Sequence, residues 1–204
     1  YNPMINAGAI VVASCLASEI SFDTMLDTIR ALCMDPDINL DKKVYHSEMS
    51  HISRNRAIAY LLESKGYIEK NKDVENSLHF YVKMCSLSVT AESLAGLGLI
   101  LANDGIHPDT GKRLLSSQAV KIVKTLMFTC GMYDGSGEFA VRVGIPSKSG
   151  VGGGILSVVD GEMGIGIFGP ALDKKGNSVA GECVLEYMSH ELHLHMFDPQ
   201  RHTL

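Results

Sequence analysis

Two apolar segments in the last third of the chain constrain its fold more than any other feature. They are Gly154–Val159 and Met163–Phe168, and the connection between them contains Asp160-Gly161. Short apolar segments bounded by turn residues read as strands, and Asp-Gly is a strong signal for a hairpin turn. Because both segments are apolar on both faces, we expect an antiparallel sheet that other elements cover on both sides.

Helical patterns occupy most of the remaining chain. They cover Ala7–Ala17, Ser21–Met34, Ala57–Leu62, Asp73–Ser88, Ala91–Ala102, Ser117–Phe128 and a closing segment from Ser178 to about Met196. Asp35–Tyr45 is polar and is predicted to be a loop, whereas Thr90 is predicted to cap the helix that follows it. Helices followed by strands and one closing helix are typical of an α+β fold. Without a repeat or a low-complexity linker, we expect residues 1–204 to form one domain or a large part of one.

Composition excludes several classes of partner. The chain has 46% apolar and 20% charged residues and a net charge of −5, with no basic run. Nucleic-acid or anionic-membrane binding therefore has no electrostatic basis, and no apolar run approaches the length of a bilayer span. Five cysteines without regular spacing favour reduced thiols. His190 and His193 could share a helix face, but His195 does not and no acid completes a site, so we assign no metal.

The stretch Cys130–Gly154 carries the clearest chemical signal. It places Tyr133 in a Gly-rich turn and then gives Lys148-Ser149-Gly150, followed by Val151 and three glycines. We expect this tripeptide to begin an apolar strand. Its Lys would bring positive charge beside an anionic group, its hydroxyl could donate a hydrogen bond, and the Val151 N–H could face a developing oxyanion. A plain surface turn before a strand would have the same local sequence.

Earlier polar residues allow two interpretations each. Asn6 lies where a turn becomes a helix, which suits a helix N-cap or a ligand contact. Glu48 and Asn55 are seven residues apart, so one helix would place both on one face, where they could bind an ammonium and a carboxylate. The same segment also suits the solvated start of a helix. Tyr81 lies on the apolar stripe of its helix, which is more typical of a core residue than of a ligand contact.

Seven short segments, taken in order, resemble one known family. They are N-P-M-I-N-A-G-A-I at Asn2–Ile10, S-E followed by R-N within Ser47–Asn55, F-Y before C-S in Phe80–Ser86, L-A-N-D-G at Leu101–Gly105, C-G-M-Y-D at Cys130–Asp134, K-S-G-V at Lys148–Val151 and L-D-K-K-G-N-S at Leu172–Ser178. The chain thus resembles the glutaminases of the animal kidney/liver type and their bacterial relatives. This resemblance implies the fold of serine β-lactamases and penicillin-binding proteins, a helical cluster with an antiparallel sheet. It also implies hydrolysis of L-glutamine to L-glutamate and ammonia, without cofactor or metal.

The resemblance also implies a set of site residues. The positions that align with substrate contacts of the family are Asn6, Glu48, Asn55, Tyr81, Tyr133 and Val151. Glu48 would bind the substrate ammonium, and the Val151 N–H would form half of an oxyanion hole. Tyr133 would assist proton transfer beside the nucleophile, and Lys148 would support the site electrostatically. Asn6, Asn55 and Tyr81 would hydrogen-bond the carboxylate and the amine.

One part of the family pattern is missing from these residues. The family's nucleophile is a Ser with Lys three residues later, upstream of the segment that matches Asn2–Ile10. No Ser in this sequence has Lys at that spacing, and the sequence begins with Tyr1 rather than Met. We therefore expect a piece of a longer glutaminase, lacking the N-terminal part of the fold and inactive alone.

Two alternatives to that expectation remain open. One is a truncated, non-catalytic isoform that co-assembles with intact subunits. The other is a β-lactam hydrolase or peptidase of the same fold. The resemblance further implies a homodimer or homotetramer, activation by phosphate and a mitochondrial location, with the cytoplasm as the alternative.

Overall fold

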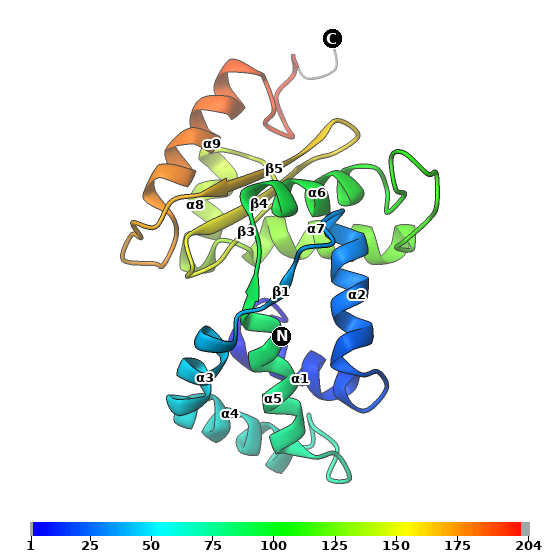
Figure 1. Ribbon diagram of the computed structural model, residues 1–204. Coiled ribbons are helices and arrows are strands. Elements are labelled where there is room, and N and C mark those ends of the chain that lie inside the picture. The colour runs from blue at the N-terminus through cyan, green and yellow to red at the C-terminus, as the bar shows by residue number, and fades with distance from the viewer. Residues whose placement is uncertain (1, 201–204) are drawn as a thin grey trace. The chain divides into compact units, whose positions relative to one another are not determined.

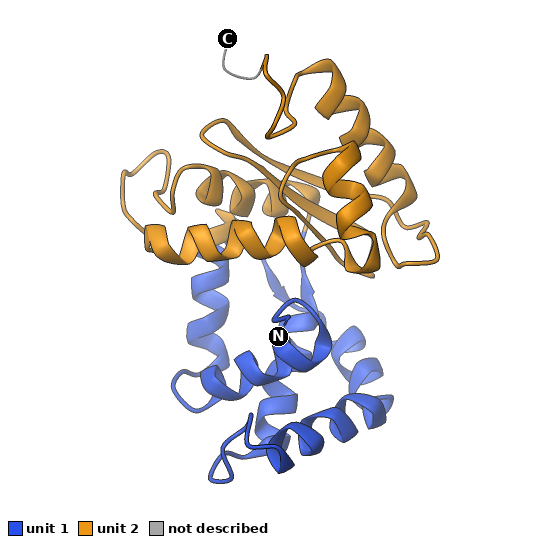
Figure 2. Cartoon of the chain, turned by 180° about the vertical axis from the view of Figure 1, so that it is seen from behind, with its two compact units in different colours: residues 1–31, 36–89 blue, residues 32–35, 90–204 orange. Residues whose placement is uncertain are grey.

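The computed structural model describes residues 2–200 (Figure 1). The chain forms two compact units (Figure 2). Unit 1 takes the chain up to Ala31 and then Pro36–Val89, and unit 2 takes Leu32–Asp35 and the chain from Thr90 onward. The predicted α+β class is confirmed, because helices in both units accompany small antiparallel sheets. The prediction of one partial domain over residues 1–204 stays a prediction.

Unit 1 is a helical cluster. Its elements are α1 (Asn6–Ala17), α2 (Phe22–Cys33), β1 (Asn39–Leu40), α3 (Lys42–Ser50), α4 (Ser53–Ser64), α5 (Val74–Cys85) and β2 (Leu87–Ser88). The last two residues of α2 belong to unit 2. In its core, Ile10 of α1, Ala59 of α4 and Leu78 of α5 are inaccessible to solvent. The short strands β1 and β2 pair antiparallel.

One prediction for unit 1 is wrong, and one condition behind another is not met. The segment predicted as a loop, Asp35–Tyr45, contains β1 and the first turn of α3, which Asp41 caps by accepting hydrogen bonds from the backbone N–H groups of Lys43 and Val44. The polar segment that follows would place Glu48 and Asn55 on one face only as a single helix, and it breaks between α3 and α4. Ser50 Oγ donates to the Ser47 carbonyl, and the His51 N–H bonds the Glu48 carbonyl instead of continuing the α-helical ladder. Side chains that bond nearby carbonyls in this way compete with the helix.

Unit 2 is a sheet covered by helices. Its elements are α6 (Ala91–Ala102), α7 (Ser117–Cys130), the 3₁₀ turn η1 (Tyr133–Gly135), α8 (Ser136–Arg142), β3 (Ser147–Ser149), β4 (Gly154–Val159), β5 (Met163–Phe168) and α9 (Val179–Glu191). The strands run antiparallel in the order β3-β4-β5. The predicted hairpin is confirmed with its predicted bounds, and Val159 pairs with Met163 across the turn.

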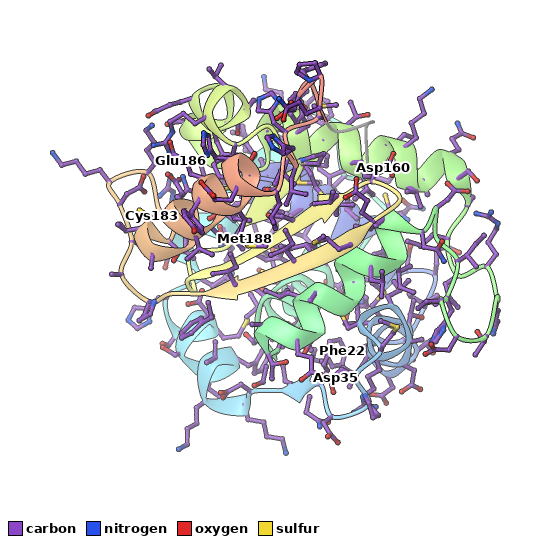
Figure 3. All side chains as sticks on the ribbon, turned by 90° about the horizontal axis from the view of Figure 1, so that it is seen from above. Phe22, Asp35, Asp160, Cys183, Glu186 and Met188 are labelled. Carbon is purple, nitrogen blue, oxygen red and sulfur yellow. The ribbon has the colours of Figure 1, made fainter. Side chains whose placement is uncertain are left out.

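Each face of the sheet has its own cover. On one face α6 packs directly on the strands, where a Cβ on Gly98 would lie 2.7 Å from Gly164 Cα of β5. On the other face Leu185 of α9 and Phe139 of α8 join Ile155 in a buried cluster, and Met188 of α9 packs against it (Figure 3). Five of the six residues of β4 are buried, whereas Phe168 of β5 is 64% exposed. The expected double cover therefore holds for β4 and only partly for β5.

In unit 2, two elements and two boundaries also differ from expectation. The helix α8 and the strand β3 were not predicted. Lys148-Ser149 closes β3 instead of beginning the next strand, because the Gly150 N–H donates to the Gly154 carbonyl and makes the turn into β4. The closing helix ends at Glu191, since the Leu194 N–H bonds the Ser189 carbonyl and His193 has a φ of 52°.

No single helix within residues 2–200 has both the length and the apolar character needed to cross a membrane. Taken together, α1 and α2 pass that test of length and composition as a pair bent by 115°.

Candidate active site

In unit 1 the structure joins two of the predicted substrate-binding residues. Asn6 Nδ2 donates to Asn55 Oδ1 at 2.9 Å, across 49 positions of sequence. Asn6 is the first residue of α1, and its side chain makes no capping hydrogen bond because Ile5 occupies the N-cap position. The N-cap interpretation of Asn6 is therefore wrong. The contact also fixes both amides, because each now has one side committed to the other residue.

Glu48 and Asn55 do not share a helix face. Glu48 lies in the last turn of α3, whereas Asn55 lies in the first turn of α4. The argument from their spacing is therefore wrong, although Asn55 still meets Asn6. Both Glu48 and Asn6 are exposed to solvent, whereas Asn55 is partly buried.

Glu48 and Tyr81 both interact with the thiol of Cys85. Loss of water around the Cys85 thiol raises its pKa, a hydrogen bond with Tyr81 lowers it, and the negative charge of Glu48 raises it. The ring of Tyr81 is partly buried against the unit 1 core, so the core interpretation is correct for its ring while its hydroxyl engages Cys85. The sequence did not identify Cys85 as a site residue, although the F-Y…C-S motif contains it.

In unit 2 three predicted residues lie together. Lys148 Nζ sits 4.8 Å from the centroid of the Tyr133 ring, close enough for a cation–π interaction. Burial raises the pKa of Tyr133, and a hydrogen bond from the backbone of Val151 opposes that rise. Burial also lowers the pKa of Lys148, against the opposing effect of Cys130. The Lys148 ammonium and the Val151 N–H thus both lie beside the phenol of Tyr133.

The backbone at Tyr133 is unusual. Its φ is 52°, in the left-handed region that residues with side chains rarely adopt. Such a conformation costs on the order of 1–2 kcal/mol and persists only where the surroundings hold it. Tyr133 is the first residue of η1, between α7 and α8.

The Ser149 hydroxyl is buried, and the hydrogen bond that it was expected to donate to a ligand stays a prediction. Successive residues of a strand face opposite sides, and Ser149 is 1% exposed whereas Lys148 is only partly buried. Ser149 Oγ has no hydrogen-bond partner among residues 2–200. The Lys148 ammonium meanwhile donates to the Ser149 carbonyl.

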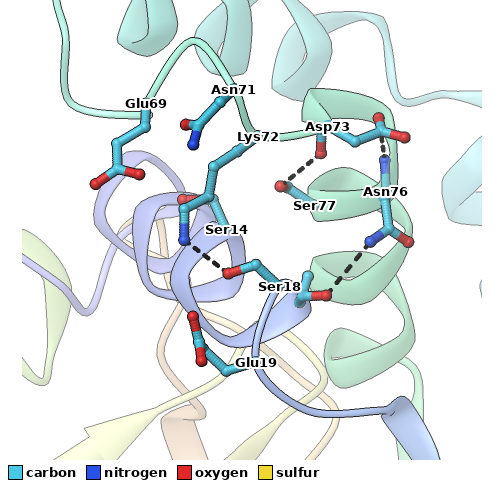
Figure 4. Close-up of a pocket in the computed structure, with 10 residues that line it drawn as sticks. Ser14, Ser18, Glu19, Glu69, Asn71, Lys72, Asp73, Asn76 and Ser77 are labelled. Carbon is cyan, nitrogen blue, oxygen red and sulfur yellow. Dashed lines mark hydrogen bonds between the residues drawn. The ribbon is translucent and has the colours of Figure 1, made fainter.

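Two cavities in the described part of the chain are lined by residues other than the predicted ones. One cavity of about 360 Å³ lies where α1 ends and α5 begins (Figure 4). Its lining is polar, and Lys72 Nζ donates to Ser18 Oγ at 2.6 Å within it. Another, of about 440 Å³, is lined by Arg142 and by the C-terminal histidines His190, His193 and His195. Within the described part of the chain, no group of three His, Cys, Asp or Glu residues is placed to hold a metal ion.

Comparison with known proteins gives a consistent result. The glutaminase family model matches residues 1–197. The glutaminase of Clostridium tetani is 51% identical over 199 residues, which covers 96% of this chain and 64% of that protein. The glutaminase of Fusobacterium nucleatum is 52% identical over 200 residues, with 97% and 65% covered. The chain thus spans slightly less than two thirds of the curated relatives it matches.

Solved structures agree with the sequence comparison. The covalent complex between a Bacillus subtilis glutaminase and 5-oxo-L-norleucine, formed by reaction with 6-diazo-5-oxo-L-norleucine, superposes with a TM-score of 0.90 at 40% identity. The matched region covers 97% of this chain and 70% of the Bacillus subtilis chain. The arrangement of helices and sheet is therefore that of the serine β-lactamase-like glutaminases. The chain belongs to the glutaminase family.

Proposed function

We propose that the protein containing this chain hydrolyses the side-chain amide of L-glutamine, giving L-glutamate and ammonia. The observation that carries the proposal is the group of Tyr133, Lys148 and Val151 in unit 2, within a chain of this family. The Bacillus subtilis relative forms a covalent complex when it reacts with 6-diazo-5-oxo-L-norleucine. A covalent product with an amino-acid reagent supports a nucleophilic mechanism for the family.

The proposed reaction has two steps. A serine hydroxyl attacks the side-chain carboxamide carbon, the C–N bond breaks, and the nitrogen leaves as ammonia with the serine's proton. Water then attacks the γ-glutamyl ester, releases glutamate and returns a proton to the serine. No serine of the printed sequence is followed three residues later by Lys. We therefore assign the attack to a serine outside the printed sequence.

The unit 2 residues suit the charge changes of this reaction. Because burial raises the pKa of Tyr133, its phenol stays protonated near neutral pH and can donate to the departing nitrogen. The Val151 N–H, which bonds the Tyr133 phenol in this structure, is suited to stabilise the oxyanion once substrate binds. Lys148 adds positive charge beside the same ring.

The unit 1 residues suit the amino-acid end of glutamine. Asn55 uses its Oδ1 to accept from Asn6, so its NH₂ group remains to donate to the α-carboxylate. Asn6 uses one N–H, so its Oδ1 remains to accept from the α-ammonium. The carboxylate of Glu48 is suited to pair with that ammonium, and the Tyr81 hydroxyl adds a further polar contact.

Assembly, regulation and location are proposals of a broader kind. We propose a homodimer or homotetramer that phosphate activates, on family resemblance alone. The relatives compared here are bacterial, which supports the cytoplasmic alternative and gives the mitochondrial prediction no support.

Ammonia release tests the proposal. The full-length protein should release ammonia from L-glutamine and should not hydrolyse a chromogenic β-lactam. Cleavage of the β-lactam without glutamine hydrolysis would assign the protein to a different enzyme class of the same fold. The Glu48→Gln variant should raise KM for glutamine because it removes the charge that pairs with the ammonium, and an unchanged KM would remove Glu48 from the site.

A further inference from the structure

The strained turn at Tyr133 is held by a loop that sequence reasoning left without a role. This loop, Leu172–Ser178, carries the last of the family motifs and leads into α9. Asn177 of this loop is 0% exposed, and its Nδ2 donates to the Met132 carbonyl at 3.2 Å. Met132 immediately precedes Tyr133, so the Asn177 amide is bonded to the peptide group that sets the direction of the tyrosine.

Asn177 is itself fixed by the loop. Asp173 Oδ1 accepts from the backbone N–H groups of Asn177 at 2.8 Å and Lys175 at 2.9 Å. The Asp173 N–H donates in return to the Asn177 carbonyl at 2.8 Å. Outside this ring of bonds, Lys175 Nζ pairs with Glu138 of α8 at 2.7 Å. The loop is therefore closed on itself and tied to the helix that follows the Tyr133 turn.

The same loop lies next to Tyr133 and Val151 of the proposed site. Gly176 has a φ of 98°, and a Cβ at that position would lie 3.5 Å from Val151 Cγ1 and 3.6 Å from Tyr133 Cε2. A Cβ at Gly176 would thus be in ordinary van der Waals contact with both residues, which places the loop next to them. The positive φ, and not a lack of space, is what favours glycine at this position.

Only one side of the Asn177 amide is hydrogen-bonded within residues 2–200. Its Oδ1 is buried and has no hydrogen-bond partner among residues 2–200. A buried amide with an unsatisfied acceptor is destabilising, so a purely structural role would be served better by an apolar residue. The side that is used contacts the backbone beside Tyr133.

We infer that Asn177, held by Asp173, is a positioning residue for Tyr133 and acts on the chemical step through it. The inference rests on the proposed function for its kinetic consequence but not for its structural one. The hydrogen bond from Asn177 fixes the orientation of the peptide group between Met132 and Tyr133. This peptide group keeps the Tyr133 backbone in the left-handed region, and the phenol therefore stays beside Lys148 and the Val151 N–H.

A double-mutant cycle in the full-length protein tests the inference. Asn177→Ala should lower kcat for glutamine about tenfold or more while KM changes by about twofold or less. In a Tyr133→Phe background the same change should lower kcat by less than about twofold, because the group it positions is already gone. An equal loss of kcat in both backgrounds would overturn the inference, since a general structural defect acts regardless of Tyr133.

Asn103→Ala is the matched control. Asn103 Nδ2 also donates to a loop carbonyl of unit 2, that of Ile106 at 2.9 Å, but its bond does not involve the Tyr133 turn. This variant should leave kcat within about twofold of the wild type. If Asn177→Ala fails to fold, Asp173→Ala removes the loop closure from a partly exposed position and should give the same kinetic pattern.

Hydrogen exchange separates this inference from the proposed function. The amides of Met132 and Gly135 are both hydrogen-bonded within the turn, to Ser136 Oγ and to the Met132 carbonyl. They should exchange faster in Asn177→Ala and not in Asn103→Ala. A wild-type protein without glutamine turnover would refute the proposed function, whereas unchanged exchange at this turn would refute the positioning role.

Discussion

The amide pair Asn6–Asn55 gives a prediction whose direction depends on which atom donates. Asn55→Asp keeps the acceptor that receives Asn6 Nδ2, so the contact within unit 1 survives. It removes the NH₂ group proposed to donate to the substrate carboxylate and puts a negative charge in its place. The variant should therefore fold normally and bind glutamine poorly.

The size of the effect follows from the bond that is lost. A hydrogen bond to a charged group contributes about 1.5–3 kcal/mol, which corresponds to an increase in KM of roughly 10- to 150-fold. Repulsion between the new carboxylate and the substrate adds to this. Because the proposed contact is to the part of glutamine that does not react, kcat should change much less than KM.

Steady-state hydrolysis of glutamine by the full-length protein measures both constants. Asn55→Ala is the matched control, because it loses the NH₂ group without adding charge and should raise KM by a smaller factor. Thermal denaturation of each variant checks folding. If Asn55→Asp left KM within twofold of the wild type, the proposed orientation of the amide pair would be wrong.

Three further predictions concern unit 2. Tyr133→Phe in the full-length protein should lower kcat by about 10²- to 10⁴-fold with little change in KM, as expected for loss of a proton donor, and unaltered turnover would remove Tyr133 from the chemistry. Gly166→Ala should destabilise the protein by about 1–3 kcal/mol or more, because a Cβ there would overlap the Ala91 carbonyl and lie 2.7 Å from Ala95 N of α6. The control is Gly137→Ala in α8, where a Cβ would have no atom within 4 Å. Chemical denaturation should show this control to be neutral or stabilising. A hydrogen bond from the backbone of Asn177, with smaller effects from Lys175 and Gly176, lowers the pKa of Asp173. The ionised Asp173 carboxylate therefore stabilises the folded protein above its ordinary pKa of about 3.9. This stabilisation is lost as the pH falls through the lowered pKa. Asp173→Asn should flatten that acid limb of the stability profile, and an identical limb in both proteins would contradict the assignment.

Local signals predicted the elements whose cause is local. The hairpin of β4 and β5 followed from two apolar segments and Asp160-Gly161, and the structure has the same bounds. Thr90 caps α6 as predicted, with Ser93 completing a capping box. The break between α3 and α4 was missed because it depends on side chains that bond nearby carbonyls. The helix α8 was missed because its seven residues, S-G-E-F-A-V-R, are too few to show a clear period.

The candidate site depended on contacts that spacing cannot predict. Glu48 and Asn55 were grouped for a reason that is wrong, whereas Asn55 actually meets Asn6 through the packing of α1 against α4. Tyr133, Lys148 and Val151 come together only when β3 pairs with β4 and the Tyr133 turn folds back on them. Family resemblance named these positions. It left Asn177 without a role, because a buried amide in a loop has no periodic signal.

The most direct test is a crystal structure of the full-length protein after reaction with 6-diazo-5-oxo-L-norleucine. The account predicts a covalent adduct on a serine outside the printed sequence, with the Val151 N–H donating to the oxygen of the trapped carbonyl. Glu48 and the Asn55 NH₂ group should contact the ammonium and carboxylate of the same molecule. An adduct that Val151 and Tyr133 do not touch would contradict the account.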